Sequence, residues 1–249
     1  MNQSVMQTSF EPQRDDSLES EIEAIRSRLQ RLKNELKLGN DGGKTSRGQV
    51  AATSSLEQVI NYNLVYGLGH AFELRDAVLH WAQHFSDSCH LLDLGCGIGL
   101  ADIVLRICGI ETLSYAGVDH NREMLKIAFM INPGSSFTQE MRSLERRRGS
   151  GLVIINHLFG QNELSNKNIS DFCFHLSKIF NNEVMILNVE PNLSSVNLYR
   201  RLFQDEMLRI GFKQETEDYA STATQFRVPK NSWFARYKMK QKSDDGKRL

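Results

Sequence analysis

The sequence lacks several features that would assign it to a specialised class. Its 249 residues include 30 basic and 30 acidic side chains, so the formal net charge is zero. No whole-chain electric field therefore attracts the protein to nucleic acid or to a membrane surface. No window approaches the length of a membrane span, and the start at Met1 lacks a charged segment followed by an apolar run. These absences predict a soluble, cytoplasmic protein.

Cysteine is also scarce. No two cysteines have C-x-x-C spacing, and no matching histidine pattern accompanies them. We therefore expect neither a metal site nor a disulfide framework. Two of them fall in apolar runs, which is typical of small core residues in a reducing compartment. The four are Cys89, Cys96, Cys108 and Cys173.

The most informative stretch is residues 91–100, which reads LLDLGCGIGL. Apolar residues leading into an acid and alternating glycines indicate a buried parallel strand, a tight turn and then a helix. Glycine can adopt positive φ and lets a ligand lie against the main chain, at which the helix points its N–H groups. A dinucleotide fingerprint starting at Gly95 would need glycine at position 100, where this chain has Leu100. The stretch therefore predicts a nucleotide site of another type.

A second acid supports this interpretation. Residues 115–119 read YAGVD and predict another strand that ends at Asp119. The acid lies roughly twenty residues after the glycines, where such folds place the carboxylate that binds ribose. A carboxylate here would accept hydrogen bonds from both ribose hydroxyls.

The run from Asp93 to Gly99 resembles motif I of the class I S-adenosylmethionine (SAM) dependent methyltransferases, and residues 119–125 resemble motif II. The resemblance covers residues 55–239. It implies an α/β fold, a Rossmann-like seven-stranded sheet with helices on both faces, whose last strand is antiparallel and lies between the two before it. It also implies methyl transfer from SAM to an acceptor that the sequence does not identify. The alternative is a non-catalytic scaffold or regulatory subunit that binds SAM or S-adenosylhomocysteine (SAH).

The resemblance also implies a set of cofactor-binding positions. Asp93 would face the methionine end of SAM, His120 would border the adenine, and Glu140 would lie near the adenine amine. The full set is Asp93, Gly95, Cys96, Gly97, Gly99, Asp119, His120, Glu140 and Asn156.

Residues 151–155 predict a fourth strand, and Asn156 and His157 follow it at the position of motif IV. Imidazole titrates near neutral pH, so His157 is the first candidate for a catalytic base, with Asn156 second. Alternatively, both residues only shape the pocket. An N-P-P-Y type signature is absent, which weighs against methylation of nucleic-acid bases.

Other positions are candidates for the substrate pocket. Helices that precede the first strand wall this pocket in the family, and the ends of later strands and their connections complete it. Packing against the sheet is an equally good interpretation of the aromatic members. The candidates are Tyr62, Tyr66, His70, Phe159, Glu190 and Arg227. The acceptor would be a small molecule or an exposed group of a macromolecule, and nucleic acid stays open as a partner.

The N-terminal region has its own pattern. Apolar residues recur at heptad a/d spacing between Leu18 and Leu36, which predicts a helix over 16–38. We favour a short coiled coil that joins subunits into a homo-oligomer or binds a partner protein; the alternative is a helix packed on its own domain. Residues 39–54 have linker composition, and residues 1–15 and the basic tail 240–249 are expected to be disordered or frayed.

Overall fold

The computed structural model describes residues 16–39, 54–85, 88–156, 166–180, 182–191, 194–222 and 230–239. Three predicted site residues, His157, Phe159 and Arg227, lie outside these ranges. The predicted disordered N-terminus, most of the linker and the basic tail lie outside them too.

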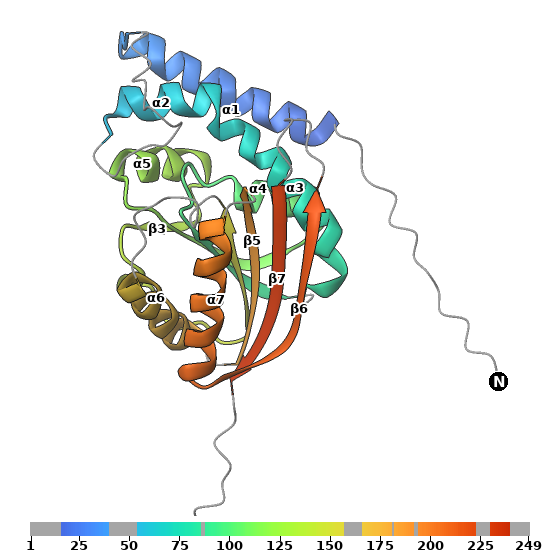
Figure 1. Ribbon diagram of the computed structural model, residues 1–249. Coiled ribbons are helices and arrows are strands. Elements are labelled where there is room, and N and C mark those ends of the chain that lie inside the picture. The colour runs from blue at the N-terminus through green and yellow to red at the C-terminus, as the bar shows by residue number, and fades with distance from the viewer. Residues whose placement is uncertain are drawn as a thin grey trace, which may run out of the picture.

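A seven-stranded sheet in the order β3-β2-β1-β4-β5-β7-β6 forms the centre of the molecule (Figure 1). Strands β1 to β5 are parallel, whereas β7 pairs antiparallel with both β5 and β6. The strands are β1 (Cys89–Leu94), β2 (Thr112–Val118), β3 (Ser136–Thr138), β4 (Ser150–Asn156), β5 (Glu183–Pro191), β6 (Phe212–Thr222) and β7 (Lys230–Met239). This strand order, with the last strand inserted between its predecessors, confirms the predicted Rossmann-like fold.

Helices cover both faces of the sheet. The central strands are buried on both sides, so they are apolar almost throughout rather than alternating. On one face α6 (Asn166–Ile179) and α7 (Ser194–Arg209) pack against one apolar cluster. The other face carries α3 (His70–Trp81), α4 (Ala101–Ile107) and α5 (Arg122–Ile131). No described helix is both long and apolar enough to span a bilayer.

The N-terminal helix α1 (Asp16–Glu35) lies along α2 (Leu56–Val65) and is part of this domain (Figure 1). Four of its heptad positions are at most 4% exposed and belong to the same apolar cluster as α3, α4 and α5. They are Leu18, Ile22, Ile25 and Leu29. The expectation of a coiled-coil seam that stands clear of the domain is therefore wrong, and the alternative is correct.

Polar contacts fix α1 in this position. Arg26 Nη1 donates to the carbonyl oxygen of Leu64 at 2.9 Å, and Lys33 Nζ donates to Asn61 Oδ1 at 2.8 Å. The heptad spacing was consistent with either partner, because an apolar stripe is equally well covered by another copy of the helix or by α2 and α4. Self-association of the chain, or binding of a partner protein, stays a prediction.

Candidate functional site

The glycine-rich turn after β1 has the backbone conformation that its sequence requires. Gly95, Gly97 and Gly99 adopt φ values of 71°, 52° and 79°, which side chains disfavour. The N–H groups of Gly95 and Cys96 donate to the carbonyl oxygen of Val118 at 2.8 and 3.0 Å, so the turn is fixed to the end of β2. A Cβ placed on Gly97 would meet no atom within 4 Å. At Gly97 the turn therefore presents its main chain beside open space.

Asp119 lies directly beside this turn. Its Oδ2 accepts a hydrogen bond from Gly97 N at 2.9 Å, and its Oδ1 accepts one from Asn121 N at 2.8 Å. Burial raises the pKa of Asp119, whereas the two N–H donors lower it. Each oxygen has one further lone pair, so the carboxylate can accept two more hydrogen bonds from a ligand.

Asp93 is a second, fully buried acid at the same edge, with 4% of its surface exposed. Tyr115 donates its hydroxyl to Asp93 Oδ2 at 3.1 Å. Burial raises the pKa of Asp93 to about 7, the hydrogen bond from Tyr115 lowers it, and the negative charge of Asp119 raises it. Sequence reasoning missed Tyr115, although the two-residue period of a strand places it on the same face as Asp119.

Asn156 ends β4 and comes next to the glycine turn. In the parallel register Leu94 pairs with Ile155, so Asn156 lies beside Gly95. Its Oδ1 atom is buried and has no hydrogen-bond partner among the described residues. Buried polar atoms are nearly always paired, so this orphaned acceptor indicates a missing donor.

Three other predicted cofactor residues lie at the same edge, of which His120 and Glu140 are exposed and Cys96 is buried. The carbonyl oxygen of His120 accepts a hydrogen bond from Gln139 at 2.8 Å, which joins the ends of β2 and β3. The exposed carboxylate of Glu140 forms an ion pair with Arg142. Cys96 is buried, and burial is the main cause that raises the pKa of its thiol well above the usual value.

Two of the predicted pocket residues meet at the break between α2 and α3. Tyr62 Oη lies 3.3 Å from His70 Nε2, and His70 Nδ1 lies 3.1 Å from Glu73 Oε2. Burial, together with the charges of Glu73 and Asp119, raises the pKa of Tyr62 to about 12. Tyr66 is 56% exposed, with its ring centroid 6.0 Å from that of Tyr62. Glu73 was missed, although it lies three residues after His70 on the same helical face.

Glu190 is not in the pocket, contrary to the prediction. It is 0% exposed and accepts a hydrogen bond from Asn188 Nδ2 at 3.3 Å. Asn188 Oδ1 in turn accepts from Arg200 Nε of α7 at 2.7 Å. Glu190 lies two residues after Asn188 and so shares the face of the sheet that α7 covers. Its role is to balance the buried positive charge of Arg200.

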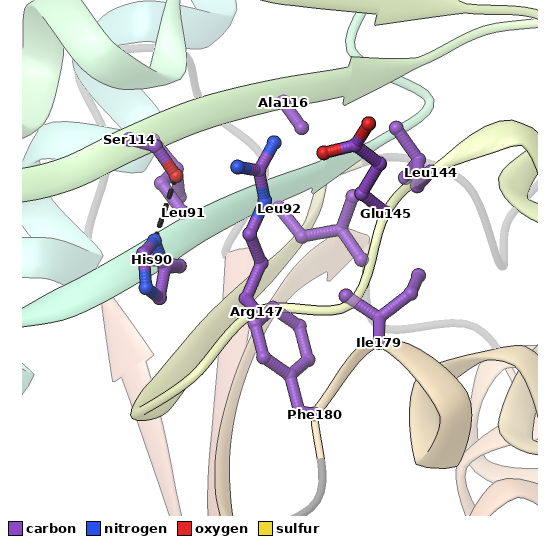
Figure 2. Close-up of a pocket in the computed structure, with 10 residues that line it drawn as sticks. All are labelled: His90, Leu91, Leu92, Ser114, Ala116, Leu144, Glu145, Arg147, Ile179 and Phe180. Carbon is purple, nitrogen blue, oxygen red and sulfur yellow. Dashed lines mark hydrogen bonds between the residues drawn. The ribbon is translucent and has the colours of Figure 1, made fainter.

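A separate small pocket lies at the amino ends of β1 and β2, remote from the glycine turn. Figure 2 shows His90, Ser114 and Arg147 around it, with His90 Nδ1 and Ser114 Oγ 2.7 Å apart. Arg147 belongs to the basic run 146–148 and lies away from the acids at the carboxyl edge. Within the described ranges no three acidic, histidine or cysteine side chains are grouped so that they could hold a metal ion.

Comparisons with known proteins gave structural likenesses only. No family model matches the chain, and no curated protein matches it significantly. A SAM-dependent methyltransferase from Leishmania major is 13% identical over 88% of this chain and 82% of its own, with a TM-score of 0.48. The magnesium protoporphyrin IX methyltransferase from Synechocystis, solved with bound SAH, is 14% identical over 81% and 96%, with a TM-score of 0.48. A SAM-dependent methyltransferase from Methanosarcina mazei is 13% identical over 64% and 95%, with a TM-score of 0.47.

Proposed function

We propose that this chain is a class I SAM-dependent methyltransferase whose cofactor binds at the carboxyl edge of β1, β2 and β4. The observation that carries the proposal is the pairing of Asp119 with the glycine turn: a carboxylate with spare acceptor capacity lies beside Gly97, where a Cβ would meet no atom within 4 Å. In open α/β sheets ligands bind outside the carboxyl ends of the strands where the strand order reverses, here between β1 and β4.

The residues at this edge fit SAM. Asp119 would accept the two ribose hydroxyls, and Gly95 to Gly99 would let the cofactor lie against the backbone. Asn156 Oδ1, which lacks a donor, would accept a hydrogen bond from the ligand. The buried charge of Asp93 would attract a cation and so favours the methionine end, which carries an ammonium group. Glu140 and His120 would border the adenine.

When bound, SAM supplies a methyl group on an electron-poor sulfonium, so the protein mainly has to align a nucleophile and exclude water. The turn and Asp119 fix the position of the cofactor, and Asn156 fixes one polar atom beside it. The α1–α2 layer, packed over α4 and α5, limits access of water from that side. An amide such as Asn156 does not take up a proton at neutral pH; its role would be to orient a ligand. His157 stays a predicted base.

The scaffold alternative is less favoured by the structure. It required an N-terminal helix free to pair with another chain, whereas the apolar face of α1 is buried against its own domain.

The four cysteines are buried free thiols, which supports a reducing, cytoplasmic location.

The proposal is tested by titrating purified protein calorimetrically with SAM and with SAH, after mass spectrometry has established that neither has copurified. We expect both to bind in a one-to-one ratio. Transfer from methyl-labelled SAM to hydroxyl- and amine-bearing candidate acceptors then tests catalysis. An empty, folded protein that binds neither compound would refute the proposal.

A further inference from the structure

A hydrogen-bonded line of three side chains leads from the interior of α3 to the edge of the proposed cofactor site. Glu73 is 5% exposed, and its Oε2 atom lies 3.1 Å from His70 Nδ1. The other ring nitrogen, His70 Nε2, lies 3.3 Å from the Tyr62 hydroxyl. Tyr62 is partly exposed, and the charge of Asp119 contributes to raising the pKa of its hydroxyl. The neighbouring Asn63 donates to Met124 Sδ at 3.4 Å, which places α2 against the start of α5, just after Asp119. The line therefore runs toward the carboxyl edge that carries Asp119.

The break between α2 and α3 brings these residues together. In a continuous helix, residues 62 and 70 would be about 12 Å apart along the axis. Here the 3-10 turn Gly67–Gly69 interrupts the helix between α2 and α3, and His70 lies against Tyr62. A Cβ on Gly67 would lie 2.2 Å from Asn63 Oδ1 and 3.3 Å from the Tyr62 ring, so a larger residue here would have to displace the Asn63 side chain.

The chemistry of these three side chains determines which group donates and which accepts in each hydrogen bond. A carboxylate accepts only, so His70 Nδ1 donates its proton to Glu73. The other ring nitrogen, Nε2, then accepts from the Tyr62 hydroxyl. The phenol oxygen in turn presents its lone pairs outward as a hydrogen-bond acceptor. This is the arrangement by which a buried acid orients an imidazole as a base.

We infer that Tyr62, His70 and Glu73 form a proton relay that accepts the proton of the methyl acceptor, whose nucleophile is therefore a hydroxyl or a protonated amine; this inference rests on the proposed function. The nucleophile forms a bond to the methyl carbon, the bond between that carbon and sulfur breaks, and its electron pair goes to sulfur. The acceptor's proton moves to the Tyr62 oxygen while the phenolic proton moves to His70 Nε2. Glu73 is a positioning residue that stabilises the resulting imidazolium.

The relay can be tested without an identified acceptor. Sinefungin is a SAM analogue in which a carbon bearing an ammonium group replaces the sulfonium and its methyl, so the ammonium nitrogen takes the place of the transferable methyl and its N–H donors point toward the acceptor. SAH has the same ribose, adenine and amino-acid groups but no such donor. We expect Tyr62→Phe to weaken sinefungin binding at least fivefold and SAH binding less than twofold, as measured by calorimetry.

Two further variants complete the test. Glu73→Gln should weaken sinefungin binding in the same selective way but less, because the imidazole loses its orienting charge. Tyr219→Phe removes the hydroxyl of a tyrosine on β6 that bonds Glu217, and it should change neither affinity. Equal weakening of both ligands by Tyr62→Phe would assign Tyr62 to cofactor binding, and no weakening would remove it from the site; either result overturns the relay.

A spectroscopic measurement tests the polarity directly. A long-range ¹H–¹⁵N spectrum of the full chain should place the proton of neutral His70 on Nδ1, and a proton on Nε2 alone would overturn the relay. If SAH itself does not bind the wild-type protein, the proposed function fails and the relay fails with it. If SAH binds normally and only the sinefungin contrast is missing, the relay alone is refuted.

Discussion

Two acids at the carboxyl edge of the sheet, Asp119 and Glu190, have similar sequence settings and opposite environments. Each follows an apolar run at the end of a parallel strand. Asp119 lies on the face of the glycine turn, accepts from Gly97 and Asn121, and retains lone pairs for a ligand. Glu190 lies on the face of α7, is fully buried, and belongs to the network of Asn188 and Arg200. The face on which an acid lies, rather than its position at the strand end, separates the acid proposed to bind the cofactor from the one in a buried network.

The largest effect is expected from substitution of Glu190, the acid in the buried network, and it concerns the stability of the fold. Glu190→Ala removes the negative charge that raises the pKa of the buried Arg200 guanidinium against the lowering effect of burial. We expect it to lower the free energy of unfolding by about 3 kcal/mol, as measured by urea denaturation. Glu111→Ala, at an exposed acid before β2, should change it by less than about 0.5 kcal/mol. Equal effects of the two substitutions would contradict the structural role of Glu190.

The next effect is a pH dependence at Asp93. Its pKa is raised to about 7 in the folded protein, so the folded state retains a proton that the unfolded chain loses near pH 4. This contribution to stability is complete below pH 4 and is lost as the pH rises to 7. The unfolding free energy of the wild type, relative to Asp93→Asn, should therefore fall by about 2 kcal/mol between pH 5 and 7. Unfolding free energies of the wild type and Asp93→Asn that change in parallel with pH would contradict the raised pKa of Asp93.

Substitution of Asp119, the acid proposed to bind ribose, should have a smaller effect in free energy, and on SAH affinity rather than on stability. Asp119→Ala removes the acceptors proposed for ribose and should weaken SAH binding at least tenfold, about 1.4 kcal/mol, in calorimetry. Glu190→Gln, which preserves shape on the other face, should change SAH affinity less than twofold. Equal weakening of SAH binding by Asp119→Ala and Glu190→Gln would contradict the different roles proposed for the two acids.

The smallest expected effect concerns the turn itself. Gly97→Ala places a side chain at a φ of 52° and should cost about 1 kcal/mol of stability in urea denaturation. Its Cβ would project into the open space proposed for the cofactor, so SAH affinity should fall as well. Gly134→Ala is the matched control, since a Cβ there also meets no atom and its φ is not positive. Unchanged SAH affinity in Gly97→Ala would place the ligand elsewhere.

The sequence predicted the sheet and the glycine turn because these depend on local patterns. Alternating glycines after an acid require a strand, a turn and a helix, and Asp119 follows at the spacing of a ribose-binding acid. The positive φ values at Gly95, Gly97 and Gly99 confirm the predicted turn. Such features are fixed within a few residues and need no knowledge of distant contacts.

Features that depend on a distant partner were predicted poorly. The apolar stripe of α1 does not reveal which surface covers it, and Ile25 packs within its own domain. Strand β5 is buried on both faces, so its sequence did not show which face Asn188 and Glu190 share or that α7 covers it. The link between Tyr62 and His70 depends on the 3-10 turn at Gly67, whose geometry the sequence indicated only as a helix break.

The most direct test of the account is a crystal structure of the protein with SAH. We expect the ribose hydroxyls of SAH to bond the carboxylate of Asp119 and the ligand to pass over Gly97 between β1 and β4. Density for SAH at another position, with Asp119 still bonded only to Gly97 and Asn121, would contradict it.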